Sequence, residues 1–194
     1  MRCFTWALIG AMVASAGGCG GTGAAAGAGH GHLATTPCAA DVLALGPGPR
    51  VVPMTGEHAV LFILANRGPR ACTVRGYPRV TLYDADGGVL RFRYADGGGP
   101  YVTGGKPVTV VLAPKGTAYV LVAKYRCDLG IIATAATIRL TLSARNSQVF
   151  AAREPVGVPG PPGLSYCSGG PRDPGQLVTV SPVEPTPQAA SSLP

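Results

Sequence analysis

Apolar and polar residues alternate with a period of two along much of the chain. In residues 137–143, isoleucine or leucine stands at every second position, while Arg139 and Thr141 occupy positions between them. Successive side chains of a strand point to opposite faces, so this pattern predicts a strand with one face on a core and one in water. Residues 108–112 and 80–83 repeat the alternation. The dominant period therefore predicts β-structure.

Two further runs, residues 58–66 and 117–124, are more continuously apolar. Strands that are covered on both faces lose the alternation, so these runs predict central strands. Residues 176–181 predict a last strand, and only residues 129–136 suit one or two helical turns. Glycine, proline and aspartate separate the runs at intervals of about eight to twelve residues, as in β-sandwiches and barrels. The pattern thus predicts an all-β domain.

The first nineteen residues have the pattern of an export signal. Arg2 precedes an apolar run over residues 4–13, and a string of small residues leads to Cys19. The run is far shorter than the roughly 20 residues that a membrane-spanning helix needs. Small residues before a cysteine resemble a bacterial lipobox, in which the cysteine is acylated and becomes the first residue of the mature chain. The segment also fits ordinary cleavage after Ala16, which would give a secreted protein.

Cysteine parity favours the lipobox. Cys3 leaves with the signal, and acylation of Cys19 leaves an even number of cysteines for disulfides in an oxidising compartment. These four are Cys38, Cys72, Cys127 and Cys167. We therefore predict a protein anchored at the outer face of the cell membrane by fatty acids, such as palmitate, on Cys19. No close C-x-x-C pair indicates zinc, and spacing alone does not choose among the three pairings that four cysteines allow.

Composition divides the chain into four parts. We predict a signal peptide over residues 1–18, a flexible tether rich in glycine and alanine over 19–37, one folded domain over 38–181 and a proline-rich disordered tail over 182–194. The formal net charge is +7, but only 13% of residues are charged. That mild bias differs from the footprint of a nucleic-acid-binding protein, and we expect no nucleic-acid partner.

Residues 66–87 carry the most specific motif. A strand ends in Asn66, a turn follows, and the chain continues as Cys72-x-Val74-x-Gly76-Tyr77-Pro78-x-Val80, followed by a strand closed by Asp84-x-x-Gly87. This motif resembles that of a large actinobacterial family of secreted proteins and lipoproteins with an Ig-like domain of unknown function. The resemblance covers residues 38–181.

The resemblance implies an Ig-like antiparallel β-sandwich stapled by two disulfides, Cys38 with Cys72 and Cys127 with Cys167. It supplies no catalytic residues. One departure stands out, since the family often has Pro-Gly-Gly where this chain has Pro114-Lys115-Gly116. Lysine in the second central position disfavours a type II turn, so we predict a type I turn there.

Enzymatic chemistry is poorly supported. The predicted domain has one histidine, His58, and no G-x-S-x-G motif, so a hydrolase is the weakest hypothesis. A metal-handling protein for copper or zinc is the alternative function, with His30, His32 and His58 as its ligands and Met54 nearby. Two imidazoles on a glycine-rich tether give weak binding, and we predict neither a metal site nor a cofactor.

The best candidates for binding are four arginines around Cys72. Arg67, Arg70, Arg75 and Arg79 are dense in a chain that is otherwise low in charge. If they converge, they suit a phosphate or carboxylate. The expected partners are the membrane through its lipid anchor, and an anionic lipid, a wall polymer or an envelope protein. We therefore predict a non-catalytic, lipid-anchored binding or scaffolding module of the cell envelope.

Overall fold

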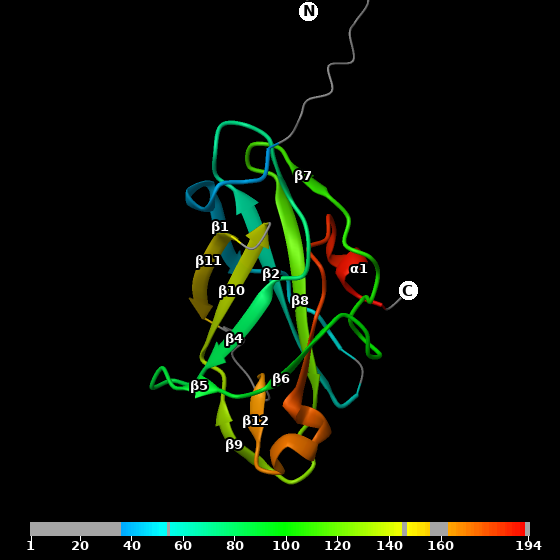
Figure 1. Cartoon of the computed structure of the whole chain (residues 1–194). Helices are drawn as coiled ribbons and strands as arrows, with labels where there is room; N and C mark the ends of the chain where they lie inside the picture. Colours follow the sequence, from blue (N-terminus) through cyan, green and yellow to red (C-terminus); the bar gives the residue numbers. More distant parts are fainter. Residues whose placement is uncertain (1–35, 54, 145–146, 156–162, 193–194) are drawn as a thin grey trace, which may run out of the picture. The chain divides into compact units, whose positions relative to one another are not determined.

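A computed structural model describes residues 36–53, 55–144, 147–155 and 163–192, and strands dominate it (Figure 1). The strands are β1 (Leu43–Pro47), β2 (Glu57–Asn66), β3 (Cys72–Val74), β4 (Arg79–Tyr83), β5 (Val89–Leu90), β6 (Arg93–Asp96), β7 (Val110–Leu112), β8 (Thr117–Tyr125), β9 (Ile131–Thr134), β10 (Thr137–Ala144), β11 (Ser147–Pro155), β12 (Ser165–Cys167) and β13 (Leu177–Val180). The short helices are η1 (Ala40–Val42), η2 (Gly170–Arg172), η3 (Pro174–Gln176) and α1 (Pro187–Ala190).

Two large sheets enclose the main core. One has the order β1-β2-β8-β13-β6 and the other β11-β10-β4-β5, while β12-β9 and β3-β7 form two small sheets. The core includes Phe62 and Leu64 of β2 and Leu82 of β4, none of which is exposed to solvent. The protein is thus an all-β, sandwich-like domain, as predicted.

The burial of single strands follows the predicted periods. In β10, Ile138, Leu140 and Leu142 are buried while Arg139 is exposed. The central strands β2 and β8 are buried on both faces, because a second apolar cluster covers the face that points away from the main core. This cluster consists of Leu61, Tyr101, Val102, Leu121, Ala123 and Ala190. The continuous apolar runs therefore mark covered central strands.

Two details differ from the predicted sheet. β13 pairs in parallel with β6, so the fold is not purely antiparallel. Residues 129–136 form no helix in the structure, because β9 pairs antiparallel with β12. The sequence of β9, Ile-Ile-Ala-Thr, is rich in β-branched residues, which favour strands.

The predicted disordered tail is wrong for residues 182–192. Val183 is fully buried, and Glu184 and Tyr119 exchange two backbone hydrogen bonds of 2.8 and 2.9 Å. Thr186 then caps α1, which places Ala190 in the second apolar cluster. The outer face of β8 is apolar, so the segment removes apolar surface from water when it covers that face. This burial stabilises an ordered conformation, although the proline content predicted disorder. The ordered domain therefore extends past residue 181.

Two disulfides, Cys38–Cys72 and Cys127–Cys167, confirm the pairing that the resemblance implied. The first joins the segment before η1 to β3, and the second joins the loop after β8 to β12. Figure 1 shows these regions at opposite ends of the domain. The nine residues of β8 run between the two ends, over about 26 Å at a rise of about 3.3 Å per residue.

Candidate functional site

The structure divides the four candidate arginines. Arg67 and Arg70 lie in the loop that follows β2, whereas Arg75 follows β3 and Arg79 begins β4 in the other large sheet. All four side chains are exposed. Arg75 is partly engaged, since its Nε donates to the carbonyl of Pro107 at 3.2 Å. The four therefore do not form one cluster, and only the first two share a loop.

The loop that carries these two arginines is held by Asn66, the last residue of β2, which is 1% exposed. Its Nδ2 donates to the carbonyl oxygens of Arg70, Leu112 and Ala113 at 2.8, 3.1 and 3.2 Å. Its Oδ1 accepts from the amide of Gly68 at 2.9 Å. A primary amide has two donor hydrogens and an acceptor, so this single side chain fixes two loops against each other.

A third cation, Lys115, lies in the second of these loops. The turn is closed by the amide of Gly116, which donates to the carbonyl of Ala113 at 2.8 Å. The type I turn predicted here is wrong, because Lys115 has a φ of 65°, the positive value that type II requires at this position. The amide of Lys115 donates to the carbonyl of Asn66 at 2.9 Å, which holds it there. The left-handed conformation costs a lysine about 1 kcal/mol.

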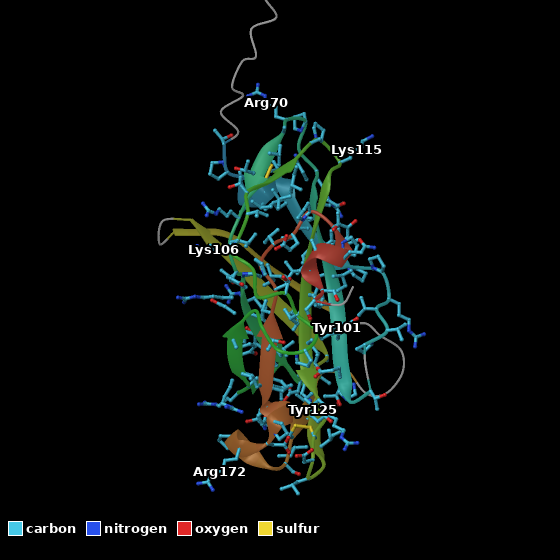
Figure 2. The ribbon with its side chains drawn as sticks, turned by 90° about the vertical axis from the view of Figure 1, so that its right-hand side faces the viewer. Arg70, Tyr101, Lys106, Lys115, Tyr125 and Arg172 are labelled. Carbon is cyan, nitrogen blue, oxygen red and sulfur yellow. A yellow bond between two sulfur atoms is a disulfide. The ribbon has the colours of Figure 1, made fainter. Side chains whose placement is uncertain are left out.

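We call Arg67, Arg70 and Lys115 the basic end. All three side chains are exposed. Figure 2 shows Arg70 and Lys115 at the same end of the domain. One exposed acid, Asp41 of η1, belongs to the same region, because the amide of Arg67 donates to the carbonyl of the neighbouring Val42 at 2.7 Å. The region therefore contains these three cations and the carboxylate of Asp41, which gives it a net positive charge.

The chain enters the domain beside the basic end. The amide of Cys38 donates to the carbonyl of Thr73, and the amide of Thr73 donates to the carbonyl of Thr36, both at 2.9 Å. The disulfide to Cys72 fixes the same segment covalently. Because Arg70 precedes Cys72 by two residues, any segment before residue 36 leaves the domain next to these cations.

The opposite end carries exposed aliphatic side chains. Leu129, Ile131 and Ile132, which we call the apolar tip, are 76%, 54% and 67% exposed. Exposed apolar residues are ordinary when they are scattered, but three within four positions form a patch that favours contact with another molecule. Arg172 and Tyr125 lie at the same end of the domain (Figure 2). The sequence analysis assigned no role to the tip residues.

Polar contacts hold the apolar tip in place. Ser168 donates from its amide to the carbonyl of Gly130 at 3.0 Å and from its hydroxyl to the carbonyl of Leu129 at 2.7 Å. The disulfide between Cys127 and Cys167 closes the base of the same loop. These bonds use backbone groups, the Ser168 hydroxyl and sulfur, so the apolar side chains of the tip take no part in them.

A buried ammonium group lies behind the tip. Lys124 is 2% exposed, and its Nζ donates to the carbonyl of Tyr125 at 2.7 Å and lies 3.8 Å from Sγ of Cys127. Burial lowers the pKa of Lys124 to about 8, although the carboxylates of Asp173 and Glu57 act to raise it. Asp173 is itself buried and accepts from the amides of Gly175 and Asp128 at 2.9 and 3.2 Å.

The residues considered for other roles lie apart. His58 faces Lys124 across the β2–β8 pair, and burial lowers its pKa, as does the charge of Lys124. The other candidate metal ligands, His30, His32 and Met54, lie outside the described residues. Within the described ranges, no group of three or more His, Cys, Asp or Glu residues is placed to hold a metal ion. Tyr77 has a structural role, since its hydroxyl donates to the carbonyl of Gly105 at 2.9 Å.

None of the helices in the described part of the chain has the length and apolar character needed to cross a bilayer. In comparisons with known proteins, neither a curated protein nor a solved structure matches the chain. A family model described as a domain of unknown function, DUF4232, matches residues 38–184. This match covers most of the 194 residues and includes both disulfides and the basic end. The chain therefore belongs to the DUF4232 family.

Proposed function

We propose that the protein is a non-catalytic module of the cell envelope, anchored by lipid at Cys19, which contacts a protein partner through its apolar tip. The observation that carries this proposal is the exposure of Leu129, Ile131 and Ile132 in the loop after β8 and the start of β9, a segment that the disulfide and the pairing with β12 already fix. A fixed loop loses little conformational entropy on binding, and exposed aliphatic side chains supply the favourable burial.

The cysteine pairing supports the anchor. Cys38, Cys72, Cys127 and Cys167 are consumed in the two disulfides. Once Cys3 is removed with the predicted signal peptide, Cys19 has no partner within the chain. Acylation uses this thiol, and two or more acyl chains on it give stable attachment, whereas a single chain gives marginal attachment.

The arrangement of the ends also supports this function. The chain enters the domain beside the Cys38–Cys72 disulfide, and the apolar tip lies at the opposite end (Figure 1). An anchor attached to the entry segment leaves the tip, at the far end of the domain, clear of the attachment point. This supports a role for the tip in contact with another envelope protein.

The anchor is tested by the intact mass of the protein from the membrane fraction. We expect a mature chain that starts at Cys19 and carries the added mass of fatty acids. Cys19→Ala should release the protein into the medium. A mature chain that starts at Gly17 without lipid mass would contradict the anchor. The proposed contact of the tip would not be affected by that result, because it is tested by a separate experiment.

The tip is tested by a photoreactive amino acid at Ile132 in living cells. We expect one discrete adduct on irradiation, which disappears when Leu129→Asp is added, because the carboxylate disrupts the apolar contact. Val52 is the matched control, since it is apolar and 82% exposed but lies on another loop. The same adduct from position 52, or no adduct from position 132, would contradict the proposed contact.

A further inference from the structure

We propose that Arg67, Arg70 and Lys115 bind the anionic headgroups of the membrane to which the chain is anchored. The inference rests on the proposed function, because the lipid anchor is the reason to expect a membrane beside the domain. It deepens that function by assigning a binding surface to the end of the domain at which the anchor is attached. Its evidence is separate from that for the apolar tip. It depends on the geometry around Asn66 and on the backbone conformation of Lys115.

The first step is the convergence of charges from two loops. Arg67 and Arg70 follow β2, and Lys115 lies about fifty positions along the chain in the turn before β8. Asn66 joins both loops through its side chain and its backbone carbonyl, so the three cations share one rigid base. Their side chains reach into solvent from that base. A fixed set of exposed cations suits a flat anionic surface.

The second step is the conformation of Lys115. Among the described residues, it is the only residue other than glycine with a positive φ. Glycine adopts this conformation freely, whereas the exposed side chain of Lys115 makes no hydrogen bond to the described part of the chain that would offset the strain. When a residue with strained backbone is not needed for packing, the strain indicates that its side chain has a function. Here the side chain contributes a positive charge.

The third step is the position of the anchor. The predicted tether enters the domain at Thr36 and Pro37, which contact Thr73 beside the basic end. The seventeen residues between Cys19 and Pro37 span at most roughly 60 Å when extended, at about 3.5 Å per residue. The anchor is thus joined to the domain at the basic end, and an extended tether keeps this end within roughly 60 Å of the headgroups. Basic residues beside an anionic leaflet each strengthen membrane binding by about 5-fold.

Arg75 and Arg79 provide a matched control. Both are exposed arginines within ten residues of Arg70, yet they lie outside the loops that Asn66 holds together. A double change to glutamine removes as much charge as the Arg67→Gln and Arg70→Gln pair. The two pairs therefore separate a localised surface from a general effect of net charge.

The experiment measures co-sedimentation of the full chain bearing Cys19→Ser with lipid vesicles. This substitution removes the acyl group, so the result does not depend on whether the anchor proposal holds. The vesicles are pure phosphatidylcholine or phosphatidylcholine mixed with phosphatidylglycerol. We expect partition onto the mixed vesicles only, and a fall in partition as salt rises to about 0.15 M, where the screening length is about 8 Å.

The variants then localise the contact. Changing Arg67, Arg70 and Lys115 to glutamine should lower partition by about 100-fold, and Lys115→Gln alone by about 5-fold. Arg75→Gln with Arg79→Gln should stay within about 2-fold of the parent chain. Lys115→Gly should lower partition as Lys115→Gln does, without lowering the thermal midpoint, because glycine tolerates the turn. Circular dichroism verifies that each variant is folded.

Several outcomes would overturn the inference. These are equal partition by the parent chain and the triple variant, an equal loss in the Arg75 and Arg79 control, and no preference for anionic vesicles. A parallel arm offers a soluble polyglycerol phosphate in place of vesicles. Binding to that polymer without binding to vesicles would overturn the membrane assignment and leave a wall polymer as the ligand.

Discussion

The two disulfides close loops of similar length, with sequence separations of 34 and 40, but they secure ends of opposite chemistry. At the basic end, a neutral buried amide, Asn66, organises the loops, and the cations point into water. At the other end, the cation of Lys124 is buried and the aliphatic side chains are exposed. The usual distribution of polar and apolar groups holds at the basic end and is inverted at the tip.

The inversion shows what a disulfide allows in a small β-domain. An apolar loop normally keeps its place by burying its own side chains. Here the Cys127–Cys167 bond and the contacts of Ser168 fix the loop from behind, so Leu129, Ile131 and Ile132 remain available. Each end is therefore held by a disulfide, by backbone bonds and by one polar side chain, Asn66 or Ser168, which leaves other side chains available for partners.

The largest predicted effect comes from removing each disulfide. Changing both cysteines of a pair to alanine should lower the free energy of unfolding by about 4 kcal/mol. The entropic part of the two losses should be similar, because the entropy that a disulfide removes from the unfolded chain depends on the length of the loop it closes, and the two loops have similar lengths. We expect a greater loss for the Cys127–Cys167 pair, because Lys124 also loses its contact with sulfur. Urea unfolding of the Cys19→Ser chain measures both.

Loss of partner contact should distinguish the two disulfide variants more sharply. Without the Cys127–Cys167 bond, the adduct from position 132 should weaken, because the tip is no longer fixed. Without the Cys38–Cys72 bond, it should persist at temperatures where the domain remains folded. The reverse order of either effect would show that the two ends are not secured independently.

How much of the fold could be predicted depended on how local the cause was. The alternation in β10 and the continuous runs of β2 and β8 gave the right strands, since each reports its own burial. The parallel pairing of β13 with β6 depends on a strand about eighty positions away, which periodicity does not reveal. The segment after residue 181 was misjudged because its order comes from contact with β8, not from its own composition.

The candidate site follows the same rule. Arg67, Arg70, Arg75 and Arg79 are close in sequence, but β3 and the crossing to the second large sheet separate them in the fold. Lys115 joins the first two only through Asn66, and its departure from the family's Pro-Gly-Gly pattern was the one signal in the sequence. Lys124 ends an apolar run, where a lysine is usually solvated, so its burial required the structure.

The smallest predicted effect is a pH dependence that Lys124, at the tip end, produces in the alkaline range. Burial lowers the pKa of Lys124 to about 8 in the folded protein, against about 10.4 in an unfolded chain. Between these values the unfolded chain holds a proton that the folded protein has released, so the free energy of unfolding rises with pH. We expect a rise of about 2 kcal/mol between about pH 8 and 10, less than the full shift implies because part of the titration lies outside this window.

Urea unfolding of the Cys19→Ser chain across this range checks the rise. It should vanish in Lys124→Met, which keeps the length of the side chain without its charge, and Lys106→Met is the matched control for net charge. Above pH 10 the curve should turn down, because burial raises the pKa of Tyr94 to about 12 and the unfolded tyrosine loses its proton first. A rise that survives in Lys124→Met would contradict the assignment, since the inverted chemistry of the tip end would then not be the source of the pH dependence.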